Sequence, residues 1–289
     1  MIKLFVSDMD GTLLHNPNDA HSRDISEENI EAVKKLHKSG VRFMMASGRD
    51  VYFRYSLEKI LGFQVDAIGM NGCNVVIDNV EICNHGLTRQ DSYDLLEMIK
   101  TCEIDSNFMG ITNVGDYVFY DIKKAPFDKF KEFENEGVMR KVPEINMVEW
   151  IKDEERPAYN KVVGLVWSTE DRDKMILKFK ERFDDRFDII YSGPENIEIM
   201  PKHISKGQAL LELIKIKGFE PTEVAVIGDS MNDVSMLEAI PFSFSMSHAD
   251  EIIKASANNI VETVAEAIEF VMEYNQKELN DENELSHAH

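Results

Sequence analysis

The order of apolar and polar residues predicts alternating strands and helices in the first part of the chain. Apolar runs at residues 2–7, 41–46 and 67–70 are short and continuous, as in strands that are buried on both faces. Apolar residues at helical spacing separate these runs, over residues 26–40 and 51–61. A strand–helix–strand repeat predicts a parallel sheet with right-handed crossovers, and ligands bind at the carboxyl ends of such strands.

The pattern changes after residue 72 to a mixture of short strands and helices. Residues 75–77 and 81–83 alternate and are joined by Asp78-Asn79, which predicts a hairpin. Beyond it, helices are predicted at residues 92–101, 127–136 and 172–183, and strands at residues 109–112, 117–121, 162–167, 187–192 and 196–200. This stretch is typical of a separate α+β unit.

The parallel-sheet pattern returns at Lys206. Predicted helices cover residues 206–216 and 263–274, and a further helix is predicted to begin at Asn232. Predicted strands cover residues 224–228 and 242–246. The chain is therefore expected to leave one domain, build a second and return to the first. The polar residues from Asn275 to His289 predict a frayed tail.

The charge balance narrows the possible functions. The 289 residues include 53 Asp and Glu against 32 Lys and Arg, a net charge of −21, which disfavours nucleic acid and anionic membranes as partners. No apolar run reaches the roughly 18 residues of a membrane span and no signal peptide is recognisable, so a cytoplasmic protein is expected. The three cysteines form no CxxC pair, which predicts buried thiols rather than zinc ligands or disulfides.

Two carboxylates directly follow the first predicted strand, in the segment Asp8-Met9-Asp10-Gly11-Thr12. Strand side chains alternate between faces, so Asp8 and Asp10 are predicted to project to one side, about 6.5 Å apart. Carboxylates this close repel each other unless a cation lies between them. The segment is therefore either a solvated turn with an Asx cap or a divalent-metal site in which one carboxylate also serves as a nucleophile.

A second strand end favours the metal site. The apolar run at residues 224–227 stops at a glycine and leads into Asp229, Asn232 and Asp233. Oxygen ligands without His or Cys nearby favour Mg²⁺ over zinc.

Two further segments are suited to an anion. Ser47-Gly48-Arg49 follows the second strand and offers a hydroxyl and backbone N–H groups, as phosphate-binding strand-to-helix junctions do. Lys206 opens a predicted helix and offers a positive charge. Each match taken alone is more typical of a helix cap, so its weight comes from its order and position in the chain.

These four segments, in this order, closely resemble the motifs of the haloacid dehalogenase-like phosphatases, in particular the Cof-type branch, and the resemblance covers nearly the whole chain. It implies an α/β fold with a Rossmann-like, doubly wound parallel-sheet core at residues 1–86 and 200–289. An inserted α+β cap domain at residues 87–199 would select the substrate. The implied activity is that of a Mg²⁺-dependent phosphatase that forms an aspartyl-phosphate.

The resemblance also assigns roles to residues. Asp8 is implied as the nucleophile and Asp10 as the general acid and base. The implied metal ligands are Asp8, the Asp10 carbonyl, Asp229 and Asp233, the last either directly or through water. The implied phosphate-binding residues are Met9, Thr12, Ser47, Gly48, Lys206 and Asn232, with Thr12 also orienting its loop.

Other residues are less decisive. Asn71-Gly72 resembles a family motif near the substrate but is equally an ordinary turn pair. Ser247-His248-Ala249 departs from the Gly-Asn-Ala of many relatives, and His248 is expected to be a surface or loop histidine. The candidates for substrate contact in the cap cannot be ranked from the sequence; they are Tyr117, Tyr120, Arg140, Trp150, Tyr159, Lys161 and Tyr191.

The expected substrate is a small phosphorylated metabolite such as a sugar phosphate, a nucleotide, a flavin or pyridoxal phosphate, and the expected assembly is a monomer or homodimer. Two alternatives remain open. A phosphomutase would use the same aspartyl-phosphate and return the phosphoryl group to the substrate. A regulator that binds a phosphometabolite without turnover would have no need of the full acid, base and metal set.

Overall fold

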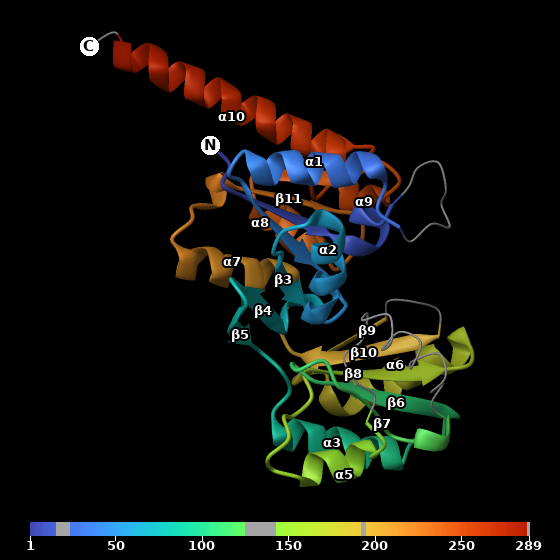
Figure 1. Ribbon diagram of the computed structural model, residues 1–289. Helices are drawn as coiled ribbons and strands as arrows, with labels where there is room; N and C mark the ends of the chain where they lie inside the picture. The colour runs from blue at the N-terminus through green and yellow to red at the C-terminus, as the bar shows by residue number, and fades with distance from the viewer. Residues whose placement is uncertain (16–23, 125–142, 192–194, 288–289) are drawn as a thin grey trace.

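Two β-sheets organise the chain in a computed structural model, which describes residues 1–15, 24–124, 143–191 and 195–287 (Figure 1). The larger sheet has eight strands in the order β13-β12-β11-β1-β2-β3-β4-β5. The smaller sheet has five, in the order β7-β6-β8-β10-β9. The chain passes from the larger sheet to the smaller one after β5 and returns after β10.

The larger sheet is parallel over most of its width. Its parallel strands are β1 (Leu4–Asp8), β2 (Arg42–Ala46), β3 (Asp66–Gly69), β11 (Val224–Gly228), β12 (Phe242–Met246) and β13 (Asn259–Val261). The hairpin of β4 (Asn74–Ile77) and β5 (Val80–Asn84) adds two antiparallel strands at one edge. Asp78 and Asn79 have φ angles of 53° and 62°, as a tight hairpin turn requires, which confirms the predicted hairpin.

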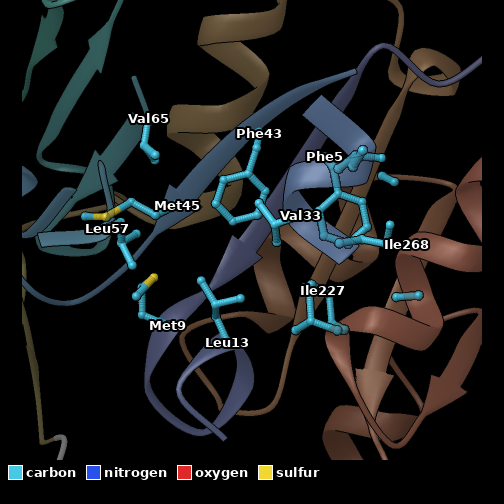
Figure 2. Close-up of a cluster of buried hydrophobic side chains, with 14 of the residues drawn as sticks. Phe5, Met9, Leu13, Val33, Phe43, Met45, Leu57, Val65, Ile227 and Ile268 are labelled. Carbon is cyan, nitrogen blue, oxygen red and sulfur yellow. The ribbon is translucent and has the colours of Figure 1, made fainter. Parts of the chain in front are cut away.

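Helices cover both faces of this sheet. On one face lie α1 (Glu27–Lys38), α2 (Arg54–Leu61) and α10 (Val264–His287), and on the other lie α7 (Lys206–Lys217), α8 (Val234–Ala239) and α9 (Glu251–Lys254). Figure 2 shows the first of the two cores, where Phe5, Phe43 and Ile227 of the sheet meet Val33 of α1 and Ile268 of α10. A sheet buried on both faces explains the continuous apolar runs of its strands.

The smaller sheet is antiparallel and is covered by helices on one face. Its strands are β6 (Ser106–Ile111), β7 (Tyr117–Phe119), β8 (Lys161–Val166), β9 (Phe187–Ile190) and β10 (Asn196–Pro201). The helices α3 (Arg89–Lys100), α5 (Met147–Lys152) and α6 (Thr169–Phe183) share its core. Figure 1 shows α3 and α5 on the side of this sheet away from the larger one.

Side-chain alternation directs the other face of the smaller sheet toward the larger one. Phe108 and Val162 belong to the core shared with the helices. Their neighbours Met109 and Val163 instead share a cluster with Met70, which follows β3 of the larger sheet. The two sheets are therefore in direct apolar contact, close to the ends of the parallel strands.

The expected α/β fold class is confirmed, and one local prediction is wrong. The residues after Asn275 form no frayed tail, because α10 continues to His287. The side-chain amide of Asn275 accepts a hydrogen bond from the Ile2 N–H at 2.6 Å and donates one to the Ile2 carbonyl at 2.8 Å. Glu, Lys and Gln are good helix formers, so a polar sequence here continues as a helix.

Several short elements were not expected from the sequence, namely α5, α9 and β13. Short helical turns also occur at Met9–Leu13, Val51–Phe53, Met70–Gly72, Ile122–Lys124 and Pro221–Glu223. The helix predicted at residues 127–136 lies outside the described residues. Cys73 and Cys83 are buried thiols as expected, whereas Cys102 is half-buried. In the described part of the chain, no helix is long and apolar enough to cross a membrane.

Candidate active site

The four predicted motifs meet at the carboxyl ends of neighbouring strands. β1 lies between β2 and β11, and its last residue, Asp8, pairs with Ala46, directly before Ser47. On the other side Ser7 pairs with Ile227, so the loop that begins after Gly228 starts beside Asp8. Sheet register thus brings these residues together from distant parts of the sequence.

A buried lysine links two of the predicted carboxylates. The Lys206 Nζ atom, in the first turn of α7, donates hydrogen bonds to Oδ1 of Asp8 at 2.5 Å and to Oδ1 of Asp233 at 2.6 Å. Burial lowers the pKa of Lys206, but the charges of Asp233 and Asp8 outweigh it and raise that pKa above its usual value. Lys206 therefore stays protonated in this site.

Asp233 also organises the loop that carries Asp229. Its Oδ2 accepts hydrogen bonds from the N–H groups of Asp229 and Ser230, both at 3.0 Å, and from the Ser230 hydroxyl at 3.1 Å. A Cβ at Gly228 would lie 2.5 Å from the Asp233 side chain, so only glycine permits this close packing. Both oxygens of Asp233 are thus already engaged by the protein.

The loops after β1 and β11 are joined through Asp229. The buried hydroxyl of Thr12 donates a hydrogen bond to Oδ1 of Asp229 at 2.7 Å. Gly11 has a φ of 88°, and a Cβ there would lie 2.3 Å from Oδ2 of Asp229. Glycine at this position therefore allows the close approach of the loop to the carboxylate, and Thr12 fixes the orientation of that carboxylate.

The carboxylates suit a divalent cation. One oxygen each of Asp8, Asp229 and Asp233 lies within 4.8 Å of the others. Oδ2 of Asp8 is buried and has no hydrogen-bond partner among the described residues. Burial, followed by the charges of Asp233 and Asp229, raises the pKa of Asp8 well above its usual value. A hard cation bound here would counter both the burial and the repulsion, so the residues present fit Mg²⁺.

Asp10 faces a different partner. Its two carboxylate oxygens accept hydrogen bonds from Arg49, from Nε at 2.8 Å and from Nη2 at 2.5 Å. The Asp10 side chain is 52% exposed, whereas Asp8 is buried. Asp10 therefore lies at the mouth of the site, on the solvent side of Asp8, and sequence reasoning did not identify Arg49 as its partner.

The predicted phosphate-binding residues occupy three loops and, for Lys206, the first turn of α7. The Ser47 side chain is buried and its Oγ accepts a hydrogen bond from the Arg49 N–H at 3.1 Å. The Asn232 side-chain amide donates to Oδ1 of Asn71 at 2.9 Å. The Met9 side chain belongs to the hydrophobic core in Figure 2, which leaves only its backbone for a ligand.

Asn71 lies buried between the larger-sheet unit and the smaller sheet. Its side chain is buried and also donates a hydrogen bond to Glu198 of β10 at 3.2 Å. Met70 and Asn71 both have positive φ angles, 50° and 56°, a conformation that Asn adopts more readily than Met. Asn71 thus connects Asn232 of the larger-sheet unit to the smaller sheet.

Of the candidate cap residues, two contact the loops beside the site. The Lys161 Nζ atom donates to the Gly48 carbonyl at 2.9 Å, and the Tyr117 hydroxyl donates to the Asp50 carboxylate. Of the other candidates, Trp150 and Tyr159 are buried in the core of the smaller-sheet unit, and Tyr120 packs against that core. Tyr191 is exposed, and Arg140 lies outside the described residues. Glu198 was not among the candidate residues. The sequence signal for it is a single charged residue between apolar residues of a strand.

His248 is a surface histidine in the turn after β12, as expected, and it also lies beside the site. Its half-exposed ring has Nε2 at 3.7 Å from Oδ2 of Asp229 and stacks on the ring of His15, with ring centroids 4.2 Å apart. Both histidines therefore border the loop that carries Asp229.

Comparison with known proteins identifies the family. The family model of haloacid dehalogenase-like hydrolases matches residues 5–269. The chain belongs to this family. The hydrolase is 25% identical to the phosphatase YwpJ of Bacillus subtilis over 283 residues, which cover 91% of this chain and 95% of YwpJ.

Two further comparisons agree with this result. The hydrolase is 26% identical to the 5-amino-6-(5-phospho-D-ribitylamino)uracil phosphatase YcsE of Bacillus subtilis, over 91% of this chain and 90% of YcsE. Its fold matches the crystal structure of a haloacid dehalogenase-like hydrolase from Bacteroides thetaiotaomicron with a TM-score of 0.78 and 24% identity, over 94% of this chain and 100% of that one. The expected enzyme class, a phosphoric monoester hydrolase, agrees with the names of these relatives.

Proposed function

We propose that this hydrolase is a Mg²⁺-dependent phosphatase of a small phosphorylated metabolite and that Asp8 is its nucleophile. The observation that carries the proposal is the buried Asp8 carboxylate, with one oxygen held by Lys206 and the other without a partner among the described residues. The first contact fixes the direction of the carboxylate, and the second oxygen is available for bond formation.

The reaction divides into two displacements. A carboxylate oxygen of Asp8 attacks the phosphorus in line and forms an aspartyl-phosphate, while the bond from phosphorus to the leaving-group oxygen breaks and that oxygen takes a proton from Asp10. Asp10 then removes a proton from the water that attacks the aspartyl-phosphate, which releases inorganic phosphate and restores Asp8. The Asp10 side chain must turn from Arg49 for these steps, and its exposed position leaves room for that rotation.

The cation would be held by Asp8, Asp229 and the Asp10 carbonyl. When bound, it neutralises negative charge on the phosphoryl oxygens. Asp233 would orient the site without binding the cation directly, because its two oxygens already bind Lys206 and the backbone of the Asp229 loop. The alternative arrangement is a contact with the cation through water, for which the carboxylate of Asp233 lies close enough to those of Asp8 and Asp229.

The phosphoryl group would be bound by groups around Asp8. These are the N–H groups of Met9 and Asp10, the Ser47 hydroxyl, the Gly48 N–H, the Asn232 amide and Lys206. Thr12 would contribute indirectly, since its hydroxyl holds Asp229. This arrangement places positive charge and donors opposite the dianionic phosphate in a site that is otherwise acidic.

Residues 87–199 would form a cap domain over a catalytic core of residues 1–86 and 200–289. The separate hydrophobic core of the smaller sheet and its two connections to the larger sheet support this division. The name of YcsE, a phosphatase of a ribitylamino phosphate, supports a small phosphorylated metabolite as the substrate class.

The test measures inorganic phosphate released from a panel of phosphorylated metabolites with Mg²⁺. We expect release from at least one compound, its loss on addition of a chelator, and its recovery with excess Mg²⁺. Asp8→Asn should lower kcat by about 10³-fold or more without unfolding the protein. The matched control is Asp105→Asn, an exposed carboxylate of the cap that pairs with Lys124.

Three outcomes contradict the proposal. Release by Asp8→Asn at the wild-type rate excludes Asp8 as the nucleophile. Isomerisation of a sugar phosphate without free phosphate identifies a phosphomutase. Binding of the compounds without turnover identifies a regulator.

A further inference from the structure

A cysteine, a histidine and a glutamate lie close together at the edge of the larger sheet, outside the candidate active site. Cys83 is the fourth residue of β5, the edge strand, and His85 directly follows the end of that strand. Side chains two positions apart in an extended chain point to the same side. Cys83 shares a hydrophobic core with Leu213 of α7. Both side chains are therefore directed at this helix, which also carries Glu212.

These three side chains form one compact group. His85 Nε2 lies 2.6 Å from Oε2 of Glu212, and the Cys83 thiol is hydrogen-bonded to the same carboxylate. One sulfur, one nitrogen and one oxygen atom of the group lie within 4.8 Å of one another. Ligand atoms around a tetrahedral ion with bonds of about 2.0–2.3 Å are about 3–4 Å apart, so small side-chain rotations are enough to surround an ion.

The group is open to solvent on one side. Cys83 is 6% exposed, whereas the His85 and Glu212 side chains are 34% and 37% exposed. Two of the three ligands can thus be reached from solvent, and a water molecule can complete the coordination of an ion bound to them. Burial, followed by the charge of Glu212, raises the pKa of Cys83 to about 11, so the sulfur keeps its proton until an ion displaces it.

Ordinary hydrogen bonding does not account for this choice of side chains. A free cysteine is commonly a small apolar residue of the core, which fits Cys73 but not a thiol that contacts a carboxylate. A thiol is also a weak donor, and a serine or threonine in place of Cys83 would serve Glu212 better. A thiolate, an imidazole and a carboxylate together are instead the ligands of a thiophilic divalent ion such as Zn²⁺.

We infer that Cys83, His85 and Glu212 bind Zn²⁺, and that the bound ion fastens the first connection between the two sheets to α7. This site is separate from the proposed phosphatase activity and does not depend on it. On binding, the Cys83 sulfur releases its proton to solvent and forms a bond to the ion. A ring nitrogen of His85 and a carboxylate oxygen of Glu212 are the other protein ligands. Mg²⁺, which prefers oxygen ligands, suits the carboxylates of the candidate active site instead.

The position of the site in the chain explains what the ion fastens. Residues 85–88 connect β5 to α3 and thus carry the chain from the larger sheet to the smaller one. The Asn84 side chain accepts a hydrogen bond from Asn160 of the smaller-sheet unit at 2.6 Å, and Gly86 packs against the same residue. A bound ion links this connection to α7, the helix that follows the second connection.

The experiment titrates the whole chain with Co²⁺ in excess Mg²⁺ and then adds Zn²⁺. Co²⁺ bound to a thiolate has a charge-transfer band in the near ultraviolet, whereas Co²⁺ bound to the carboxylates of the candidate active site has none. We expect this band in the wild-type protein and its loss as Zn²⁺ displaces Co²⁺. Zn²⁺ should also raise the melting temperature and slow amide hydrogen exchange at residues 84–88, because the ion stabilises the folded chain at this connection.

Matched variants identify the ligands. Cys83→Ser removes the sulfur but keeps a hydrogen-bond donor for Glu212, and it should abolish the band. His85→Gln should weaken Zn²⁺ binding by at least about 10-fold, because changes outside the ligand shell alone commonly cost that much. The controls Cys102→Ser and His37→Gln should behave like the wild-type protein, since neither residue belongs to a cluster of metal ligands in the described part of the chain. The two ligands are tested separately, so a variant that fails to fold leaves the other to decide.

Several outcomes overturn the inference. These are a wild-type protein without a thiolate band, a band that persists in Cys83→Ser, and a band that is lost in Cys102→Ser. A band that Zn²⁺ does not remove contradicts Zn²⁺ as the ion. Zn²⁺ binding with unchanged hydrogen exchange at residues 84–88 contradicts the link to α7. None of these measurements involves phosphate release, so their failure is distinct from a failure of the proposed phosphatase activity.

Discussion

The amine of Lys206 lies 2.5 Å from a carboxylate oxygen of Asp8, although 198 positions separate the two residues in the chain. Lys206 also lies 2.6 Å from Asp233. One buried cation thus balances two carboxylates, and the three groups belong to three different segments of the fold. The same contact that orients the proposed nucleophile therefore also contributes to the stability of the core.

Lys206→Met should destabilise the protein and stop turnover. Removal of the buried cation leaves Asp8 and Asp233 facing each other without compensation, for which we expect a loss of about 3–5 kcal/mol in the free energy of unfolding at neutral pH. Urea denaturation measures this loss. The matched control is Lys217→Met at the end of the same helix, where the lysine is partly exposed and its pair with Asp78 spans 3.4 Å. A loss below about 1 kcal/mol in Lys206→Met would contradict the stabilising role of Lys206.

Gly11→Ala should weaken metal binding. The new Cβ would overlap Oδ2 of Asp229, and we expect a loss of about 10-fold or more in Mg²⁺ affinity, measured by calorimetric titration. Gly40→Ala is the matched control, because Gly40 has nearly the same φ, 89° against 88°, and nothing lies within 4 Å of the position of its Cβ. Equal Mg²⁺ affinity in the two variants would show that the contact between position 11 and Asp229 does not matter for metal binding.

Asp10→Asn should separate catalysis from stability. An amide cannot act as general acid and base, so kcat should fall by about 10²- to 10⁴-fold. The melting temperature should change little, because the pair of Asp10 with Arg49 is partly exposed and such pairs contribute little. Asp78→Asn, at a partly exposed carboxylate paired with Arg42 at the hairpin turn, is the control and should keep its kcat. Undiminished turnover by Asp10→Asn would exclude the acid–base role.

The acid stability of the cap should depend on Arg186. Arg186 binds the carboxylates of Asp91 and Asp94 on α3 and lowers the pKa of both. At Asp91, burial raises the pKa, but hydrogen bonds from the Thr88 hydroxyl and Arg186 lower it below its usual value. A carboxylate whose pKa is lower in the folded state stabilises the fold above its unfolded pKa of about 4, and this contribution is lost as the pH falls through the folded pKa.

The measurement is thermal unfolding of the wild-type protein and of Arg186→Gln at about pH 7 and about pH 3. Arg186→Gln should melt at a lower temperature at neutral pH, and the difference should shrink at acid pH. A difference that is equal at both pH values would show that the carboxylates do not act through their charge.

The sequence predicted those features that depend on local pattern. The strands ending at Asp8 and Gly228 were evident because a strand buried on both faces is a continuous apolar run, and the hairpin at Asp78-Asn79 was evident because few residues adopt its turn conformation. The family motifs then indicated which polar residues would gather at the strand ends, and the structure does bring Asp8, Lys206, Asp229 and Asp233 together.

Features that depend on packing between distant segments could not be predicted. The partner of Asp10 is Arg49, and nothing in either local sequence indicates that pairing. Glu198 and Lys161 are single charges in apolar strands, and only the arrangement of the two sheets shows that they face the site. The two hydrogen bonds that join Asn275 of α10 to Ile2 link segments 273 positions apart, and nothing in either local sequence indicates them.

The insertion of the smaller sheet between β5 and α7 has a consequence for how such an enzyme diversifies. The carboxylates and Lys206 lie on elements of the larger sheet and its helices, whereas Lys161 and Glu198 lie on the inserted strands. In the proposed division, mutations in the inserted strands would alter which molecule is accepted while the reacting groups keep their positions. A lineage with this layout can acquire new metabolic roles by drift and selection in one segment of the gene, without reinventing its chemistry.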